Sequence, residues 1–256
     1  MLQAHSLLWH YLWVAPNIFF LVLVTLLWRR KLHKQFPVFF AFAVLGSVEQ
    51  LTLYAADVIP SVSGETFWRV FWAGLLLESV LKFALVGEIF AHVFGAYPAV
   101  AKIGKLTMRG VGVTLVFAAT VAAAYAPIDN PNYTIISRAH ILEQTIFMIE
   151  CGLLLFIFLF AGYFRLAWSN WDFGIALGLS ISACVHLATW AVMANGGLPE
   201  RRHLLAFLNM ASYHACVLIW FYYLLVPQKI AVKPAVPLPE NNLELWNREL
   251  ERLLQQ

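Results

Sequence analysis

The chain has 256 residues, of which 61% are hydrophobic and only 12% are charged, and its mean hydropathy is +0.73. Soluble domains carry about 25% charged residues, so this composition excludes an ordinary soluble protein and predicts a polytopic membrane protein. The net charge is only +3 and the basic residues are scattered between apolar segments, which argues against nucleic acid as a partner and indicates a lipid bilayer as the surroundings.

Seven segments are apolar enough to cross a bilayer, which takes about 20 residues in a helix. The first, residues 5–28, carries its basic residues after the apolar run, so we expect an uncleaved spanning helix and not a signal peptide. Turn-rich or charged stretches separate the remaining segments, which are 37–58, 67–94, 107–126, 138–165, 171–193 and 203–226. The predicted fold is therefore all-α, with one seven-helix membrane domain over residues 1–226.

The C-terminal part of the sequence changes character after the seventh segment. Residues 227–242 contain four prolines, which predicts an extended linker. In residues 243–256 the apolar side chains share one helical face and polar side chains cover the rest, which indicates a short amphipathic helix. We expect this helix to lie in the cytoplasm and to bind a protein partner.

The distribution of basic residues predicts how the bundle is oriented. One side of the predicted bundle collects ten of them: Arg29, Arg30, Lys31, Lys34, Lys102, Lys105, Arg109, Arg165, Lys229 and Lys233. The other side collects four, namely Arg69, Arg138, Arg201 and Arg202. Because cytoplasmic loops carry the excess of Lys and Arg, the N-terminus is predicted outside and the C-terminus in the cytoplasm of a multi-pass protein of the plasma (inner) membrane.

Several ionisable residues fall inside the predicted spanning helices, where an unpaired charge costs a few kcal/mol. In the third segment, Glu78 and Lys82 are one helical turn apart, as are Glu88 and His92, and all four lie within about one third of the helix circumference. The segment is therefore predicted to have one paired or hydrated stripe on an otherwise apolar helix.

A binding site is predicted where ionisable groups from several helices reach similar depths. Its expected members are Glu49, Glu78, Lys82, Glu150, His186 and His214. A secondary group, nearer the helix ends, consists of Glu88, His92, Glu143 and His140. The alternative is a purely structural set in which the same residues neutralise one another in separate contacts between helices.

Metal or haem chemistry is a second possibility for these residues, because imidazole and carboxylate groups bind zinc and iron. The candidate metal ligands are Glu88, His92, His186 and His214, and the last two are also the candidate axial ligands of a haem. None of these four residues belongs to an ExxH or HExxH motif, so the sequence identifies no specific cofactor.

The sequence favours a sensor or ligand-binding module over an enzyme. It contains no P-loop, no GxGxxG and no GxSxG motif, and its loops are too short for a large external domain. A buried polar site would bind the ligand, and residues 243–256 would contact a cytoplasmic partner, with a homo-oligomer as another possible assembly. The alternatives are a membrane-embedded metal- or haem-dependent enzyme and a proton or ion pathway.

The predicted orientation can be tested with reporter fusions. A reporter attached after Gln256 should be active in the cytoplasm, whereas one inserted into the loop 195–199 should be active outside, because the charge bias places them on opposite sides. A C-terminal reporter that is active only outside would contradict this topology.

Overall fold

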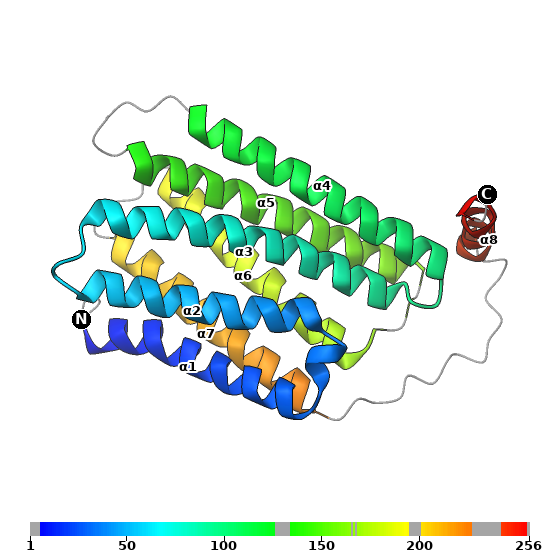
Figure 1. The fold of residues 1–256 in the computed structure, drawn as a ribbon, viewed down its shortest axis with the longest axis horizontal. Helices are drawn as coiled ribbons and strands as arrows, with labels where there is room; N and C mark the ends of the chain where they lie inside the picture. Colours follow the sequence, from blue (N-terminus) through cyan, green and yellow to red (C-terminus); the bar gives the residue numbers. More distant parts are fainter. Residues whose placement is uncertain are drawn as a thin grey trace.

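In the computed structural model, long helices lie side by side in a bundle, and one short helix crosses the end of that bundle (Figure 1). The structure describes residues 6–125, 134–164, 166, 168–194, 201–226 and 242–254. The bundle helices are α1 (Leu7–Arg29), α2 (Pro37–Val58), α3 (Gly64–Val93), α4 (Pro98–Tyr125), α5 (Thr134–Tyr163), α6 (Asn170–Ala194) and α7 (Arg201–Leu225). A 3₁₀ turn, Leu32–Lys34, precedes α2, and the short helix is α8 (Asn242–Leu254).

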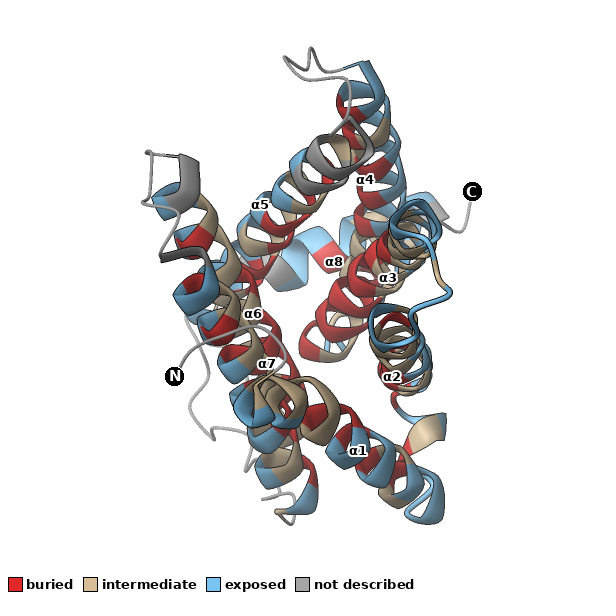
Figure 2. Ribbon diagram, turned by 90° about the vertical axis from the view of Figure 1, so that its left-hand side faces the viewer, coloured by how far each residue is buried: buried red, intermediate tan, exposed pale blue. Residues whose placement is uncertain are grey.

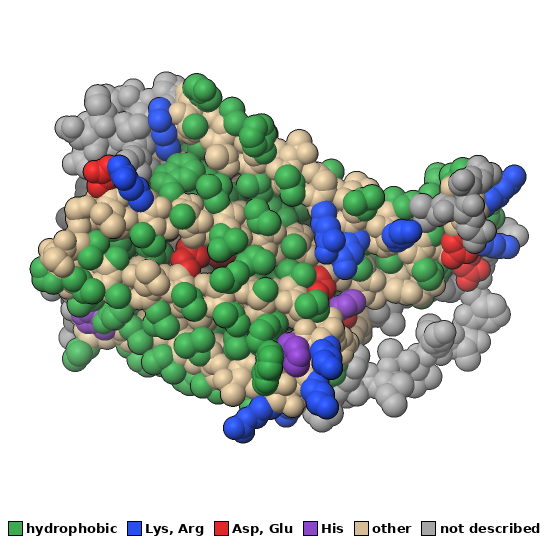
Figure 3. Space-filling view, in the orientation of Figure 1, with side chains coloured by type: hydrophobic (Ala, Val, Ile, Leu, Met, Phe, Trp, Pro, Cys, Tyr) green, Lys and Arg blue, Asp and Glu red, His purple; other side chains and the backbone are tan. Residues whose placement is uncertain are grey.

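Seven of the described helices are long and apolar enough to cross a membrane, so the prediction of an all-α, multi-pass membrane protein is confirmed. Large hydrophobic side chains cover the flank of the bundle, whereas lysine and arginine side chains lie near its ends (Figure 3). This distribution matches a bilayer around the middle of the helices.

Six helices form a closed ring, and α4 lies outside it. Going around the ring, α1 packs on α2, α2 on α3, α3 on α5, α5 on α6, α6 on α7, and α7 again on α1 (Figure 2). The outer helix α4 contacts α3 and α5. The interior of the ring is therefore the place where buried side chains from distant parts of the sequence meet.

Local sequence explains where several helices begin. Ser6 and Ser63 each accept a hydrogen bond from a backbone N–H in the first turn of α1 and α3, and Pro37 occupies the first position of α2. Helix α4 starts at Pro98, well before the predicted start at residue 107. Like Pro37 in α2, Pro98 suits the first turn of a helix, where a backbone N–H has no partner within the helix.

The helix α8 is attached to this same end of α4. The Asn247 side-chain oxygen accepts hydrogen bonds from the backbone N–H groups of Ala99 (3.1 Å) and Val100 (3.4 Å), whereas Trp246 and Leu253 are exposed. The predicted linker, residues 227–242, lies outside the described residues except for residue 242, which begins α8.

Candidate functional site: a polar pocket inside the helix ring

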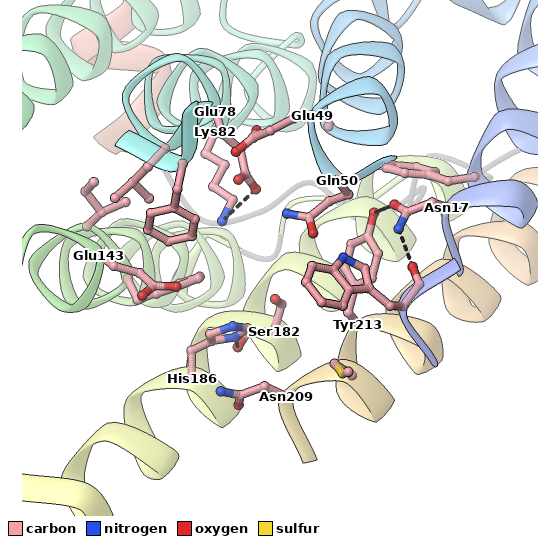
Figure 4. Close-up of a pocket in the computed structure, with 18 of the residues that line it drawn as sticks. Asn17, Glu49, Gln50, Glu78, Lys82, Glu143, Ser182, His186, Asn209 and Tyr213 are labelled. Atoms are coloured by element: carbon pink, nitrogen blue, oxygen red, sulfur yellow. Dashed lines mark hydrogen bonds and ion pairs between the residues drawn. The ribbon is translucent and has the colours of Figure 1, made fainter. Parts of the chain in front are cut away.

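A pocket of about 380 Å³ lies inside the ring, in the half of the bundle that is remote from α8 (Figure 4). All six ring helices contribute to its lining. The polar lining residues are Asn17, Glu49, Gln50, Glu78, Ser79, Lys82, Glu143, Ser182, His186, Asn209 and Tyr213.

Lys82 is the central charge of the pocket. Its Nζ atom lies 3.2 Å from Glu78 Oε1 on the same helix and 3.6 Å from Glu150 Oε2 on α5. The ammonium group also lies 4.3 Å from the centre of the Phe147 ring, within the range of a cation–π contact. Glu150 is only 1% exposed, so Lys82 neutralises a carboxylate that has no access to solvent.

Glu49 reaches the same charge cluster from α2. Its carboxylate lies over Gly74 of α3, where the Cβ of any other residue would overlap it. This glycine therefore makes room for the Glu49 side chain, which lies next to Glu78 and Lys82 in Figure 4. Among the described residues, no hydrogen-bond or ion-pair partner is found for the Glu49 carboxylate, so its oxygens can accept a bond from a ligand.

His186 lines the opposite wall of the pocket. Its Nδ1 atom lies 3.0 Å from the Ser182 carbonyl oxygen, which can only accept a hydrogen bond, so Nδ1 is the protonated nitrogen. The ring stacks on Phe147 with a centroid distance of 4.2 Å. When the imidazole is neutral, its Nε2 atom is therefore left as a hydrogen-bond acceptor.

Two amide side chains add orientable polar groups. Thr189 donates a hydrogen bond to Asn209 Oδ1 (3.1 Å), which leaves the amide N–H₂ of Asn209 as a potential donor near His186 (Figure 4). In α1, Asn17 donates to the Trp13 carbonyl oxygen (2.7 Å) directly after Pro16, and its own oxygen accepts a bond from Tyr213 (3.2 Å). The hydrogen-bonded pair of Asn17 and Tyr213 thus forms part of the pocket wall.

Aromatic side chains form most of the remaining surface. They come from α1, α2, α3, α5 and α7 and are Trp9, Trp13, Phe20, Phe42, Phe71, Phe147 and Tyr213. Apolar walls with a few convergent polar groups are typical of small-molecule sites.

The structure brings together most, but not all, of the residues that were predicted to form the binding layer. Glu49, Glu78, Lys82 and His186 line the pocket, and Glu150 contacts it through Lys82. His214 does not line it, because its ring packs against Tyr11 and Phe19 of α1 on another face of α7.

The secondary group divides in the same way. Glu143 lines the pocket, whereas the side chain of His140 lies outside the described residues. Glu88 accepts hydrogen bonds from the backbone N–H groups of Val38 and Phe39, both at 3.2 Å, and so caps the start of α2. His92 Nδ1 pairs with Asp172 Oδ1 at 2.8 Å, which ties α3 to the start of α6.

The candidate metal ligands are dispersed over the bundle. Within the described part of the chain, no three His, Cys, Asp or Glu side chains are arranged to bind one metal ion. His186 and His214, the pair considered for a haem, occupy different surroundings: the first lines the pocket, and the second packs against α1.

Neutral polar residues are the part of the pocket that the charge pattern did not indicate. Gln50, Ser79 and Asn209 line the pocket but carry no charge, so a search for intramembrane ions overlooks them. Gln50 and Asn209 could have been found as amide side chains within apolar helices. Like a charged group, an amide in a membrane-spanning helix needs a hydrogen-bond partner on another helix.

Comparison of the chain with models of known protein families, with curated proteins and with solved structures finds no match. The chemistry of the pocket is nevertheless well defined. It combines a carboxylate-rich cluster around one ammonium group, one imidazole, amide groups and aromatic walls.

The buried ion pair predicts an unequal effect of single and double substitutions. Lys82→Met should strongly lower the melting temperature in detergent, because it leaves Glu150 as an unpaired buried charge, a loss of about 3–5 kcal/mol. The double variant Lys82→Met with Glu150→Gln should recover much of this loss, because neither side chain is then charged.

The exposed pair Arg69–Glu65 is the matched control, and Arg69→Met should cost less than about 1 kcal/mol. A double variant that melts no higher than Lys82→Met alone would show that the Lys82–Glu150 contact does not govern stability.

Proposed function

We propose that this chain is a ligand-binding module of a membrane sensor and that the pocket inside the helix ring is its ligand site. The observation that carries this proposal is a pocket of about 380 Å³ that six helices surround with both charged and aromatic side chains. Its volume falls in the range of about 300–1,000 Å³ that small-molecule sites have.

The energetics of burial support a functional role for the charges. A buried ion pair is seldom more stable than apolar residues of the same volume, and a bundle can close in lipid without one. Apolar residues at all three positions could therefore stabilise the bundle as well as Lys82, Glu78 and Glu150 do together, and a binding role accounts for charged residues at the pocket.

The packing below the pocket favours a closed site over an ion pathway. Toward the α8 end, Leu85, Val86 and Ile89 of α3 are fully buried and apolar. Leu154 and Ile157 of α5, together with Leu179 of α6, extend this apolar layer across the bundle. A ligand that enters the pocket thus meets a hydrophobic floor.

Helix α3 provides a connection from the pocket to the other end of the bundle. It carries Glu78 and Lys82 in the pocket, then Glu88 at the start of α2 and His92 at the start of α6. A ligand that moves α3 would shift both contacts, and we assign that end to the cytoplasm on the basis of the charge bias. Exposed Trp246 and Leu253 of α8 are then available to a cytoplasmic protein partner.

The pocket can be blocked without disturbing its walls. Gly46 lines the pocket, and a Cβ at this position would have no neighbour within 4 Å, so Gly46→Phe should place its ring in the empty space. Gly152→Phe is the control, because Gly152 is exposed on α5 and is equally unobstructed.

Thermal unfolding of the purified variants in a library of amines, acids and neutral metabolites measures binding. We expect compounds that raise the melting temperature of the unsubstituted protein and of Gly152→Phe, but not that of Gly46→Phe. The proposal fails if no compound in the library distinguishes the blocked pocket from the open one.

A further inference from the structure

This inference rests on the proposed ligand-binding function and concerns the chemical class of the ligand. We propose that the pocket binds an amphiphilic organic cation, a protonated or quaternary amine on an apolar body, with the positive group held between Glu49 and Glu78.

The charges that line the pocket are unbalanced. Three carboxylates, those of Glu49, Glu78 and Glu150, lie around one ammonium group, that of Lys82, which leaves a formal excess of two negative charges. Lys82 is the one lysine or arginine among the described lining residues and is already paired, so the pocket favours a cation over an anion.

Glu49 is the carboxylate best placed to bind that cation. It makes no hydrogen bond or ion pair with the described residues, and the absence of a Cβ at Gly74 leaves room for it beside Glu78. The Glu49 and Glu78 carboxyl groups lie side by side in Figure 4, in a medium of low dielectric constant where two negative charges would repel strongly. A positive group between them would relieve this repulsion and form charge-assisted hydrogen bonds with both.

The aromatic walls indicate that the cation is organic. Trp13, Phe71 and Tyr213 line the same pocket, and the faces of such rings attract ammonium groups and pack against hydrocarbon. The pocket already holds one ammonium group in this way, since Lys82 lies over the Phe147 ring. A bare metal ion would leave these walls without a contact.

The position of the carboxylates on the surface indicates how an amphiphile would enter. The Glu78 side chain is 25% exposed although it lies within a membrane-spanning helix. Acidic atoms are visible in the middle of the hydrophobic flank over α2 and α3 (Figure 3). The pocket is therefore reachable from the apolar flank, where a cation with a hydrocarbon body partitions from the bilayer.

Three probes of similar size and different charge test the ligand class: phenethylamine, phenethyl alcohol and phenylacetate. Binding to the purified protein is followed by tryptophan fluorescence, because Trp9 and Trp13 line the pocket. We expect phenethylamine to bind at least about tenfold more tightly than the alcohol, because its ammonium group forms charge-assisted hydrogen bonds with the carboxylates. Phenylacetate should bind more weakly than either, because the same carboxylates repel it.

Substitution of Glu49 separates recognition of the positive charge from binding of the apolar part of the probe. Glu49→Gln should lower the affinity for phenethylamine at least about tenfold and leave that for the alcohol unchanged. Glu65→Gln, which alters an exposed carboxylate outside the pocket, should change neither. Gly74→Ala is a second variant that tests the role of Glu49. The added Cβ displaces the Glu49 carboxylate without removing its charge, so this variant should also reduce the preference for the amine.

Equal or tighter binding of the alcohol or the acid would overturn the cation inference, as would an unchanged preference for the amine in both Glu49→Gln and Gly74→Ala. If these neutral or acidic compounds still fail to bind Gly46→Phe, the pocket is a ligand site of another class. If the pocket-blocked variant matches the unsubstituted protein for every compound, the proposed function itself is refuted.

Discussion

The Lys82 ammonium group, held between Glu78 and Glu150 inside an apolar bundle, is the interaction on which the rest of the structure depends. A charge at this depth costs a few kcal/mol if it faces lipid. Helix α3 must therefore turn Lys82 toward the interior, and α5 must bring Glu150 against it. Once these two helices are fixed in this way, α1, α2, α6 and α7 close the ring and leave a pocket beside the ion pair rather than a packed core.

The polar side chains of the pocket differ from those at the α8 end of the bundle in how many of their hydrogen-bonding atoms are already bonded. In the pocket, Glu49 and His186 keep unused acceptor atoms, which suits a site that awaits a ligand. At the end near α8, by contrast, Glu88 and Asn247 are fully engaged in holding helix starts, and His92 is paired with Asp172. Polar side chains at that end therefore stabilise the bundle, whereas in the proposed site Glu49 and His186 keep atoms that could bind a ligand.

Much of the fold could be predicted from the sequence, because hydrophobic length alone identifies a spanning helix, and the Glu78–Lys82 pair follows from helical spacing within one segment. The partners of a side chain on other helices could not be predicted. Glu150 meets Lys82 only because α3 packs on α5, and Glu88 binds α2 through a contact far apart in the sequence. His214 lies at a suitable depth, but depth does not specify a face, and its ring packs against α1 instead of lining the pocket.

An experimentally determined structure of the protein in lipid nanodiscs, solved at a resolution that shows side chains, tests the central claim most directly. The account predicts that Glu49, Glu78, Lys82 and His186 surround one shared cavity and that a non-protein molecule lies between the two carboxylates and the aromatic walls. A structure in which these four side chains turn into separate contacts between helices, with no cavity among them, would contradict it.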